Sequence, residues 1–357
     1  MHIAPSALET PGRSSRPPNT PVWDSRAVGS ARRPRRLATL LLSIGLVALV
    51  SSVGVVVAAN RQVARIQRIP GLASVLSAPS DNVENFLLVG SDSREGIDPN
   101  SPDYGGIGNT GDVQGHRSDT IMVLRRDKRG GPASLLSIPR DLWVEIAGTG
   151  KKSRINSAYQ AGPATLIQTV QTALGIPIHH YVEIDFQGFK SLVDAIGGVE
   201  VCFDAPARDE HTGLFIAEPG CSVLDGVQGL AYARSRYYET YINDQWVRDG
   251  TSDLGRIKRQ QHFINTALQS AVAKVKGNPL HTGDVLVAST GAVRIDDQMD
   301  VIAAAGSLRG AVASGLAPYS LPVVGKTIGG NAVLLLAPGA QVYLDYFSGV
   351  STTPPAP

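Results

Sequence analysis

The chain of 357 residues is long enough for one large domain or two modest ones, and its 43% hydrophobic residues suit an ordinary globular core. A formal net charge of +2 is nearly neutral, which argues against a general affinity for nucleic acid, so we expect no nucleic-acid partner. Basic residues are instead gathered in a few local segments.

The first such segment precedes residues 37–59, a stretch without any charged residue, LATLLLSIGLVALVSSVGVVVAA. At 1.5 Å per residue this stretch spans the ~30 Å hydrocarbon layer of a bilayer, and we predict a transmembrane helix rather than a buried core helix or a cleaved signal peptide. Four Arg lie within the five residues before it, so the positive-inside rule favours a single-pass protein of the cell membrane with a cytoplasmic N-terminus and an exported body. Residues 1–36 are predicted to be a disordered cytoplasmic tail, and residues 60–80 an extracytoplasmic linker.

Strand and helix signals alternate through the body of the chain. Short apolar runs predict strands at 85–90, 120–124, 134–138, 180–184, 199–203, 319–324 and 332–336, and helical spacing predicts helices at 165–174, 186–196 and from 254 onward. We therefore predict an α/β fold, a single α/β/α layered domain over residues 81–346 with a mixed central sheet. Pro322 would confine its strand to a sheet edge. Residues 347–357 are predicted to be a disordered tail.

Two carboxylates lie at the ends of the first two predicted strands. Asp92 follows the first strand in GSDSR, and Asp119 opens the second in RSDT. Loop ends beside a sheet are where the active sites of α/β proteins collect. Two converging carboxylates could hold one Mg²⁺, with Mn²⁺ as the alternative, whereas the commonest use of a lone Asp is in a turn or a cap. The long Gly-rich loop 95–118 separates them, either as a lid or as an insertion.

The only two cysteines, Cys202 and Cys221, enclose a short segment rich in Pro and Gly. Such a pair indicates a disulfide formed in an oxidising compartment, and closing a loop of this length contributes about 3 kcal/mol of stability. The alternative is two unpaired buried thiols. A metal site is not expected, because two cysteines do not by themselves complete the ligand set of a zinc site.

A basic segment runs from Asp225 to Gln260. If residues 234–236 were extended, Arg234 and Arg236 would point to the same side. Asp253 is predicted to cap a helix that begins at Leu254. On that helix the polar residues Arg256, Arg259 and Gln260 share one face, and the apolar residues Leu254, Ile257, Ile264, Leu268 and Val272 share another that is typical of a core. Guanidinium groups beside a helix N-terminus suit a phosphate, although a solvated basic face is the commoner outcome.

Together these segments resemble the LytR-CpsA-Psr family of cell-envelope glycopolymer ligases, of the actinobacterial type. LAYARSR followed by DLGRIKRQQ is similar to the paired signature of the family. The other motifs follow in family order as FLLVGSDSR, RSDTIMVL, LLSIPRDLWVEI, RINSAY and HYVEIDFQGFKSLVDAIGGVEV, and the match covers roughly residues 85–275.

The resemblance implies a Mg²⁺-dependent phosphotransferase. Its donor would be a polyprenyl-pyrophosphate-linked saccharide, and its acceptor a hydroxyl of peptidoglycan. The Arg- and Ala-rich composition with frequent Gly suits a high-GC actinobacterium and favours arabinogalactan as the polymer, although a teichoic acid or a capsule would suit the same pyrophosphate site. Family positions carried over onto this sequence imply Asp92 and Asp119 as metal ligands and, with Arg140 and Arg256, as the catalytic residues. The implied pyrophosphate-binding residues are Arg94, Arg117, Arg140, Arg234, Arg236, Arg256, Arg259 and Gln260. Asp141 is predicted to orient Arg140.

Two other classes of function stay open. A non-catalytic module that binds polyprenyl phosphates or glycans would keep the arginines and need no metal chemistry. A membrane-tethered transcription regulator would need the body of the chain to be cytoplasmic, and no helix-turn-helix signal is evident. A hydrolase of the same lipid is a variant of the phosphotransferase, because water can replace the acceptor in the same site.

Overall fold

The computed structural model describes residues 61–92, 118–277 and 290–356, apart from the side chains of Asp119 and of residues 275–277. These residues fall within one compact unit, Val55–Pro357. Among the described helices, none combines the length and the apolar character that a bilayer crossing needs. The stretch 37–59 lies outside the described residues, so the transmembrane helix stays a prediction.

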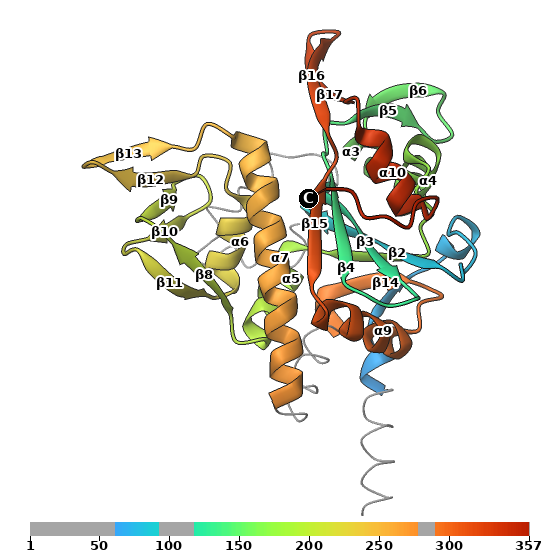
Figure 1. Ribbon diagram of the computed structural model, residues 1–357, viewed down its shortest axis with the longest axis horizontal. Helices are drawn as coiled ribbons and strands as arrows, with labels where there is room; N and C mark the ends of the chain where they lie inside the picture. The colour runs from blue at the N-terminus through green and yellow to red at the C-terminus, as the bar shows by residue number, and fades with distance from the viewer. Residues whose placement is uncertain (1–60, 93–117, 278–289, 357) are drawn as a thin grey trace, which may run out of the picture. The chain divides into compact units, whose positions relative to one another are not determined.

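A seven-stranded sheet forms the centre of this unit, in the order β1-β14-β7-β2-β3-β4-β15 (Figure 1). Its strands are β1 (Gln67–Ile69), β14 (Val293–Asp296), β7 (His180–Ile184), β2 (Val83–Ser91), β3 (Ser118–Asp127), β4 (Ala133–Ile138) and β15 (Leu316–Ser320). The sheet contains parallel pairs, such as β2 with β7, and antiparallel pairs, such as β2 with β3. The predicted α/β fold with a mixed central sheet is confirmed.

Helices cover both faces of this sheet because the apolar residues of its strands alternate between them. On β2, Leu87 and Val89 face a core that includes α3 (Asn156–Gln160), α4 (Pro163–Leu174) and α10 (Ala340–Ser348). Phe86 faces the opposite side of the sheet, where the core includes α7 (Ser252–Gly277) and α9 (Val301–Ala313). Two helical layers therefore enclose the sheet, and the polar site residues lie where its strands end.

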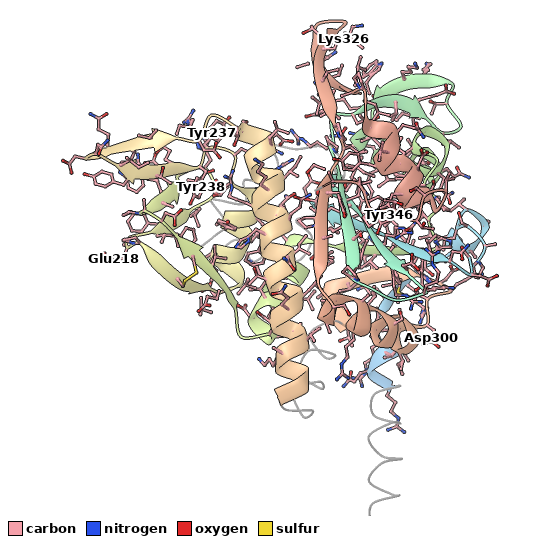
Figure 2. The ribbon with its side chains drawn as sticks, in the orientation of Figure 1. Glu218, Tyr237, Tyr238, Asp300, Lys326 and Tyr346 are labelled. Atoms are coloured by element: carbon pink, nitrogen blue, oxygen red, sulfur yellow. A yellow bond between two sulfur atoms is a disulfide. The ribbon has the colours of Figure 1, made fainter. Side chains whose placement is uncertain are left out.

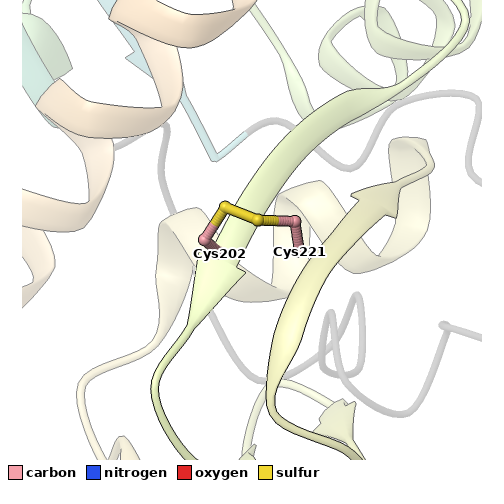
Figure 3. Close-up of a disulfide and its surroundings, with 2 residues drawn as sticks. All are labelled: Cys202 and Cys221. Atoms are coloured by element: carbon pink, nitrogen blue, oxygen red, sulfur yellow. A yellow bond between two sulfur atoms is a disulfide. The ribbon is translucent and has the colours of Figure 1, made fainter.

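A second group of strands packs on the other side of α7 (Figure 1). It consists of the pair β8 (Val199–Phe203) and β11 (Gly220–Leu224) and a four-stranded sheet, β10-β9-β12-β13 (Leu214–Ile216, Ala207–Asp209, Glu239–Ile242 and Gln245–Arg248). Helices α5 (Phe186–Ala195) and α6 (Gly226–Arg234) complete it, and Phe263 of α7 enters its core. Figure 3 shows the disulfide between Cys202 and Cys221, which joins directly opposed residues of β8 and β11 and confirms that prediction.

Two hairpins complete the described elements, β5 (Trp143–Ile146) with β6 (Lys151–Arg154) and β16 (Val323–Ile328) with β17 (Asn331–Leu336). The strand predicted at 319–324 is wrong in its bounds, because Pro322 separates edge strand β15 from β16. The edge strand itself carries Pro318, which a central strand could not accommodate. The strand predicted at 332–336 exists as β17, but it pairs in a hairpin.

Residues 61–80, predicted to be a linker, contribute a strand and a buried turn to the described unit. Strand β1 pairs with β14 at the edge of the central sheet, and the short helix η1 (Leu72–Ser74) buries Leu72. At the other end of the chain α10 extends to Ser348, and Phe347, the first residue of the predicted tail, is fully buried.

Helix α7 differs from its prediction in two ways. It begins at Ser252, whose φ of 47° lies in the left-handed region, so Asp253 belongs to the first helical turn and is not the cap. Leu254, predicted to be core, is 55% exposed. Ile264 packs on the central sheet and Phe263 on the second core, so the helix has two apolar sides instead of one.

Candidate functional site

A small pocket lies between α7 and the ends of β3 and β4. It is partly open to solvent, and its side chains come from three segments far apart in the sequence. The residues that line it are Thr120, Ile121, Met122, Ser137, Ile138, Pro139, Arg140, Arg256, Ile257 and Gln260. Three residues predicted from the sequence, Arg140, Arg256 and Gln260, therefore meet at one place.

Arg256 is held in the pocket by Asp253, one turn earlier on α7. Nη2 of Arg256 lies 2.7 Å from Oδ1 of Asp253, and Nε of Arg236 lies 3.4 Å from the same oxygen. Only 3% of Arg256 is exposed, and a buried guanidinium needs a fixed anionic partner. Asp253 therefore links the two arginine clusters of the basic segment, whereas its predicted role was to cap the helix.

Arg259 does not line the pocket with its predicted neighbours. Its Nη1 donates to Asp249 Oδ2 at 3.1 Å and its Nη2 to the carbonyl of Ser235 at 2.8 Å, while its guanidinium stacks on the ring of Tyr238. Burial favours the protonated acid, but hydrogen bonds from Thr251 and Arg259 outweigh it and lower the pKa of Asp249. Arg259 thus fastens two loops to α7, which is a structural role.

A buried carboxylate that sequence reasoning missed holds the loop after α6. Asp209 is fully buried and accepts hydrogen bonds from the Ser235 hydroxyl at 2.6 Å and the Tyr237 amide at 2.9 Å. Although burial favours protonation, the Ser235 bond and those from the backbone lower the pKa of Asp209. The spacing of 26 residues between Asp209 and Ser235 gives no sequence signal of this pairing.

Arg234 and Arg236 lie on either side of Ser235, the residue at which helix α6 ends. Arg234 ends helix α6 and its guanidinium stacks on the ring of Phe186 at 4.5 Å, whereas Arg236 contacts Asp253. Ser235 ends the helix with φ −59° and ψ 123°, so only Arg234 belongs to α6. Their side chains therefore contact different elements.

Arg140 follows β4 and pairs with its neighbour, as predicted. Its Nε lies 3.6 Å from Asp141 Oδ2, and the other oxygen of Asp141 lies 3.5 Å from Arg154 Nε. The Asp141 carbonyl accepts a hydrogen bond from the amide of Leu334 on β17, so the β16–β17 hairpin supports this turn. Arg154, within the RINSAY motif, is a cation at the site that sequence reasoning had left unassigned.

The backbone brings the two predicted metal ligands together. Gly90 pairs with Thr120 and Ser91 with Ser118, so Asp119 is the extra residue of a β-bulge and Asp92 follows the opposing residue. Such bulges re-aim a side chain beside an active site. A pair of carboxylate-bearing residues is chemically suited to Mg²⁺. Among the described residues, no group of three or more His, Cys, Asp or Glu is placed to hold a metal.

The neighbouring strand β7 brings a further buried acid to the same end of the sheet. Glu183, opposite Val89 of β2, accepts hydrogen bonds from the Tyr181 hydroxyl and from Arg294, each at 2.8 Å. Burial raises the pKa of Tyr181 well above its ordinary value, which keeps the phenol protonated as a donor. Sequence reasoning missed this cluster, because its partners lie on β7 and on the unpredicted strand β14.

Two predicted phosphate ligands, Arg94 and Arg117, lie outside the described residues, as does the side chain of Asp119. Their roles stay predictions.

Comparison with known proteins places these features in a family. The model of the LytR_cpsA_psr family matches residues 49–341. The probable cell wall biosynthesis protein LcpB of Corynebacterium glutamicum is 40% identical over 190 residues, which is 53% of this chain and 42% of that protein. TagU of Enterococcus faecalis, a polyisoprenyl-teichoic acid–peptidoglycan teichoic acid transferase, is 37% identical over 46% of this chain and 51% of that protein. The chain thus spans about half the length of these curated relatives.

Solved structures share the fold. A LytR-Csp2A-Psr enzyme from Actinomyces oris superimposes with a TM-score of 0.60 and 23% identity, covering 80% of this chain and 96% of that one. TagT bound to LI-WTA gives a TM-score of 0.56 and 19% identity over 80% of this chain and 99% of that one. With its motifs, its central sheet and its family match all in agreement, the chain belongs to the LytR-CpsA-Psr family.

Proposed function

We propose that this protein is a phosphotransferase that moves a glycopolymer from a polyprenyl pyrophosphate carrier to a hydroxyl of peptidoglycan. One observation carries the proposal. Arg140, Arg256 and Gln260, from segments more than 100 residues apart, line one pocket beside the bulge that bears Asp119. Guanidinium groups held in fixed positions match the charge and geometry of a diphosphate.

The pocket is built to stabilise charge that develops on phosphoryl oxygens. Arg256 is nearly buried and is oriented by Asp253, so its field acts in a region of low dielectric constant. Arg140 is more exposed and reaches the pocket from the opposite wall. The two guanidinium groups would therefore bind the diphosphate from two sides, with the Gln260 amide between Thr120 and the Ala233 carbonyl.

Asp92 and Asp119 would hold Mg²⁺, or Mn²⁺, at the bulge. Carboxylates on adjacent strands are suitable hard oxygen ligands for these ions. Bound there, the ion would neutralise negative charge on the pyrophosphate oxygens.

The acceptor hydroxyl would attack the phosphorus on the sugar side of the pyrophosphate. A bond forms between that phosphorus and the acceptor oxygen, and the bond to the bridging oxygen breaks, with its electron pair leaving on polyprenyl phosphate. The hydroxyl proton passes to Asp92, Asp119 or solvent. The glycopolymer is then attached through a phosphodiester, and hydrolysis results where water takes the place of the acceptor.

Sequence and comparisons support a cell-envelope location and a particular polymer class. The disulfide suits an oxidising compartment outside the cytoplasm, in line with the predicted anchor at 37–59. The resemblance of the motifs to actinobacterial members favours arabinogalactan as the polymer, while teichoic acids are named for TagU of Enterococcus faecalis.

Phosphate release from a short polyprenyl pyrophosphate tests the proposal. The full chain in detergent is assayed with Mg²⁺ and with a chelator, beside Arg140→Gln and Arg256→Gln. We expect metal-dependent release that both variants lower by about 10²–10³-fold, the usual cost of removing one charge-stabilising donor. The matched control is Arg129→Gln, which removes an exposed arginine paired with Asp127 in the turn that joins β3 and β4, at the other end of these strands from the pocket.

The alternatives give different outcomes. Tight binding of the lipid without release, even when peptidoglycan is added, identifies a binding module. Neither release nor binding rejects the pocket as a pyrophosphate site.

A further inference from the structure

The outer face of the four-stranded sheet β10-β9-β12-β13 is unusual, because it carries aromatic side chains into solvent. Of the large apolar residues that the described part of the chain exposes, Phe215 and Tyr241 lie on this face, and Tyr237 follows in the loop before β12. A half-exposed sheet normally turns polar residues outward. Concentrated exposure of apolar side chains on a soluble surface marks a binding site.

The register of the strands shows that these aromatic residues share one face. Phe215 lies opposite Arg208, and Arg208 opposite Glu239. Tyr241 is two residues beyond Glu239 and lies opposite Trp246. Since side chains alternate along a strand, all five point the same way, while the opposite face of β9 and β10 is buried in the second core. We refer to this surface as the aromatic face; it consists of Arg208, Phe215, Glu239, Tyr241, Trp246 and Arg248.

The rings of the aromatic face are held in place by their neighbours. The Arg208 guanidinium lies 4.3 Å from the centre of the Trp246 ring, and the Tyr241 ring packs against Trp246 at 5.2 Å. Beside them, Arg248 stacks on Tyr237 at 4.9 Å, and Figure 2 labels Tyr237 next to the β12–β13 hairpin. Rigid aromatic platforms bind at low cost in conformational entropy.

The charges of this face indicate what it can bind. Arg208 pairs with Glu239 at 2.9 Å and with Glu210 at 3.0 Å, and Arg248 approaches the other oxygen of Glu239 at 3.8 Å. The guanidinium groups and carboxylates neutralise one another, so the face offers no positive field for a polyanion or an anionic membrane. It offers instead hydrogen-bond donors and acceptors beside flat rings. A chain of pyranose rings, with apolar C–H faces and polar hydroxyl rims, has the matching chemistry.

The strand end and the loop beside the aromatic face are both tied to α7, the helix that carries Arg256. Strand β13 ends at Arg248, and Asp249, the next residue, holds Arg259 of α7. Tyr237 follows Arg236, which contacts Asp253. A polymer bound on the face would therefore run toward the helix turn that carries Arg256.

We propose that the aromatic face binds the glycan strand of the acceptor and directs one of its hydroxyls to the pocket. This inference rests on the proposed function, because it assigns a place to the acceptor of that reaction. The occupant is the sugar backbone itself and not its peptide stems.

Co-sedimentation with peptidoglycan freed of its stem peptides tests the inference. The full chain in detergent is compared with Phe215→Ser/Tyr241→Ser, which removes two exposed rings, and with the control Val324→Ser/Val342→Ser, which removes two exposed apolar side chains elsewhere. We expect the first variant to bind the glycan roughly tenfold more weakly, as loss of two aromatic anchors does in other interfaces, and the control to bind like the parent chain.

Release of phosphate from the lipid without acceptor separates the two proposals. The aromatic-face variant should keep this release and lose transfer to glycan. Unchanged glycan binding by the variant, or no binding by the parent chain, overturns the inference while lipid hydrolysis still stands. Binding to neutral phosphatidylcholine vesicles that is lost in the variant, without glycan binding, overturns it in favour of a membrane contact.

A second readout covers the case in which the double variant fails to fold. Soluble glycan fragments should change the fluorescence of Trp246 in the parent chain, and Trp246→Phe should abolish that change. A titration of the parent chain that leaves the fluorescence unaltered counts against the inference.

Discussion

The side-chain amide of Gln260 donates a hydrogen bond to the Thr120 hydroxyl, 3.0 Å away. The same amide donates to the carbonyl of Ala233, at 3.1 Å. One residue of α7 therefore joins the strand that bears Asp119 to the end of the helix that bears Arg234. The acidic and basic parts of the site are held in a fixed relation by protein contacts alone.

The predicted pyrophosphate-binding residues Arg259 and Arg140 should respond differently when they are replaced. Arg259→Gln breaks a buried pair with Asp249 and a bond to Ser235, and should cost about 2–4 kcal/mol of unfolding free energy. Arg140→Gln should leave stability nearly unchanged and lower the rate. Urea unfolding and phosphate release on the same preparations measure both. Equal losses of stability in the two variants would contradict the assignment.

Asp253 should act through Arg256. Asp253→Asn keeps the shape of the side chain but removes its charge, so Arg256 loses its partner and its position. We expect kcat/KM to fall roughly 10- to 100-fold, the usual effect of a misplaced catalytic group, with partial rescue by Asp253→Glu. The control is Asp244→Asn in the exposed turn of the β12–β13 hairpin, which should retain full activity. Normal kinetics in Asp253→Asn would exclude this role.

Gly255 should be intolerant of even a methyl group. A Cβ there would lie 2.5 Å from Asp249 Oδ2 and crowd the loop that Arg259 holds. Replacing glycine by alanine inside a helix normally adds about 1 kcal/mol of stability. We expect Gly255→Ala to lower stability and activity instead. Gly306→Ala in α9, where a Cβ meets nothing within 4 Å, should show the normal gain. Thermal unfolding of both variants shows whether each substitution raises or lowers the stability.

Stability should depend on the protonation of His180. Burial disfavours the imidazolium, but the carboxylates of Asp296 and Glu84, 3.4 and 3.6 Å away, outweigh it and raise the pKa of His180 to about 9. A raised pKa stabilises the fold fully below the unfolded value near 6.5, and this stability is lost as the pH rises through 9. We expect a loss of roughly 1–3 kcal/mol between pH 6.5 and 10.

His180→Gln should remove most of that pH dependence, whereas His262→Gln on the exposed side of α7 should retain it. Unfolding in urea at a series of pH values provides the measurement. An equal slope in the parent chain and His180→Gln would refute the pairing.

Sequence patterns predicted several strands well because their apolar residues form clear runs or alternate with polar ones. The run at 180–184 is β7 to the residue, and 199–203 is β8. The β12–β13 hairpin was missed, since its exposed, mixed residues show no clear alternation and its two-residue turn is Asn243–Asp244. Strands of this kind are specified by the sheet they join, which local sequence does not reveal.

Only part of the site was predicted, because some of its contacts also depend on the tertiary fold. Local spacing places Arg256 and Gln260 on one helix face, and motif order adds Arg140. Local spacing cannot show that Arg259, one residue before Gln260, contacts Asp249. That contact depends on the path of the loop after β13. Buried partners such as Asp209 are equally invisible, since their bonds join residues far apart in the sequence.

Strand β1 places the N-terminal end of the described unit under a particular mechanical constraint. It pairs in parallel with β14, and Arg68 donates to the carbonyls of Asp296, Asp297 and Met299. A pull on the chain before Gln67 would load these bonds together in shear rather than opening them one at a time. The sheet edge would then bear the force, and the pocket at the ends of β3 and β4 would keep its geometry under tension.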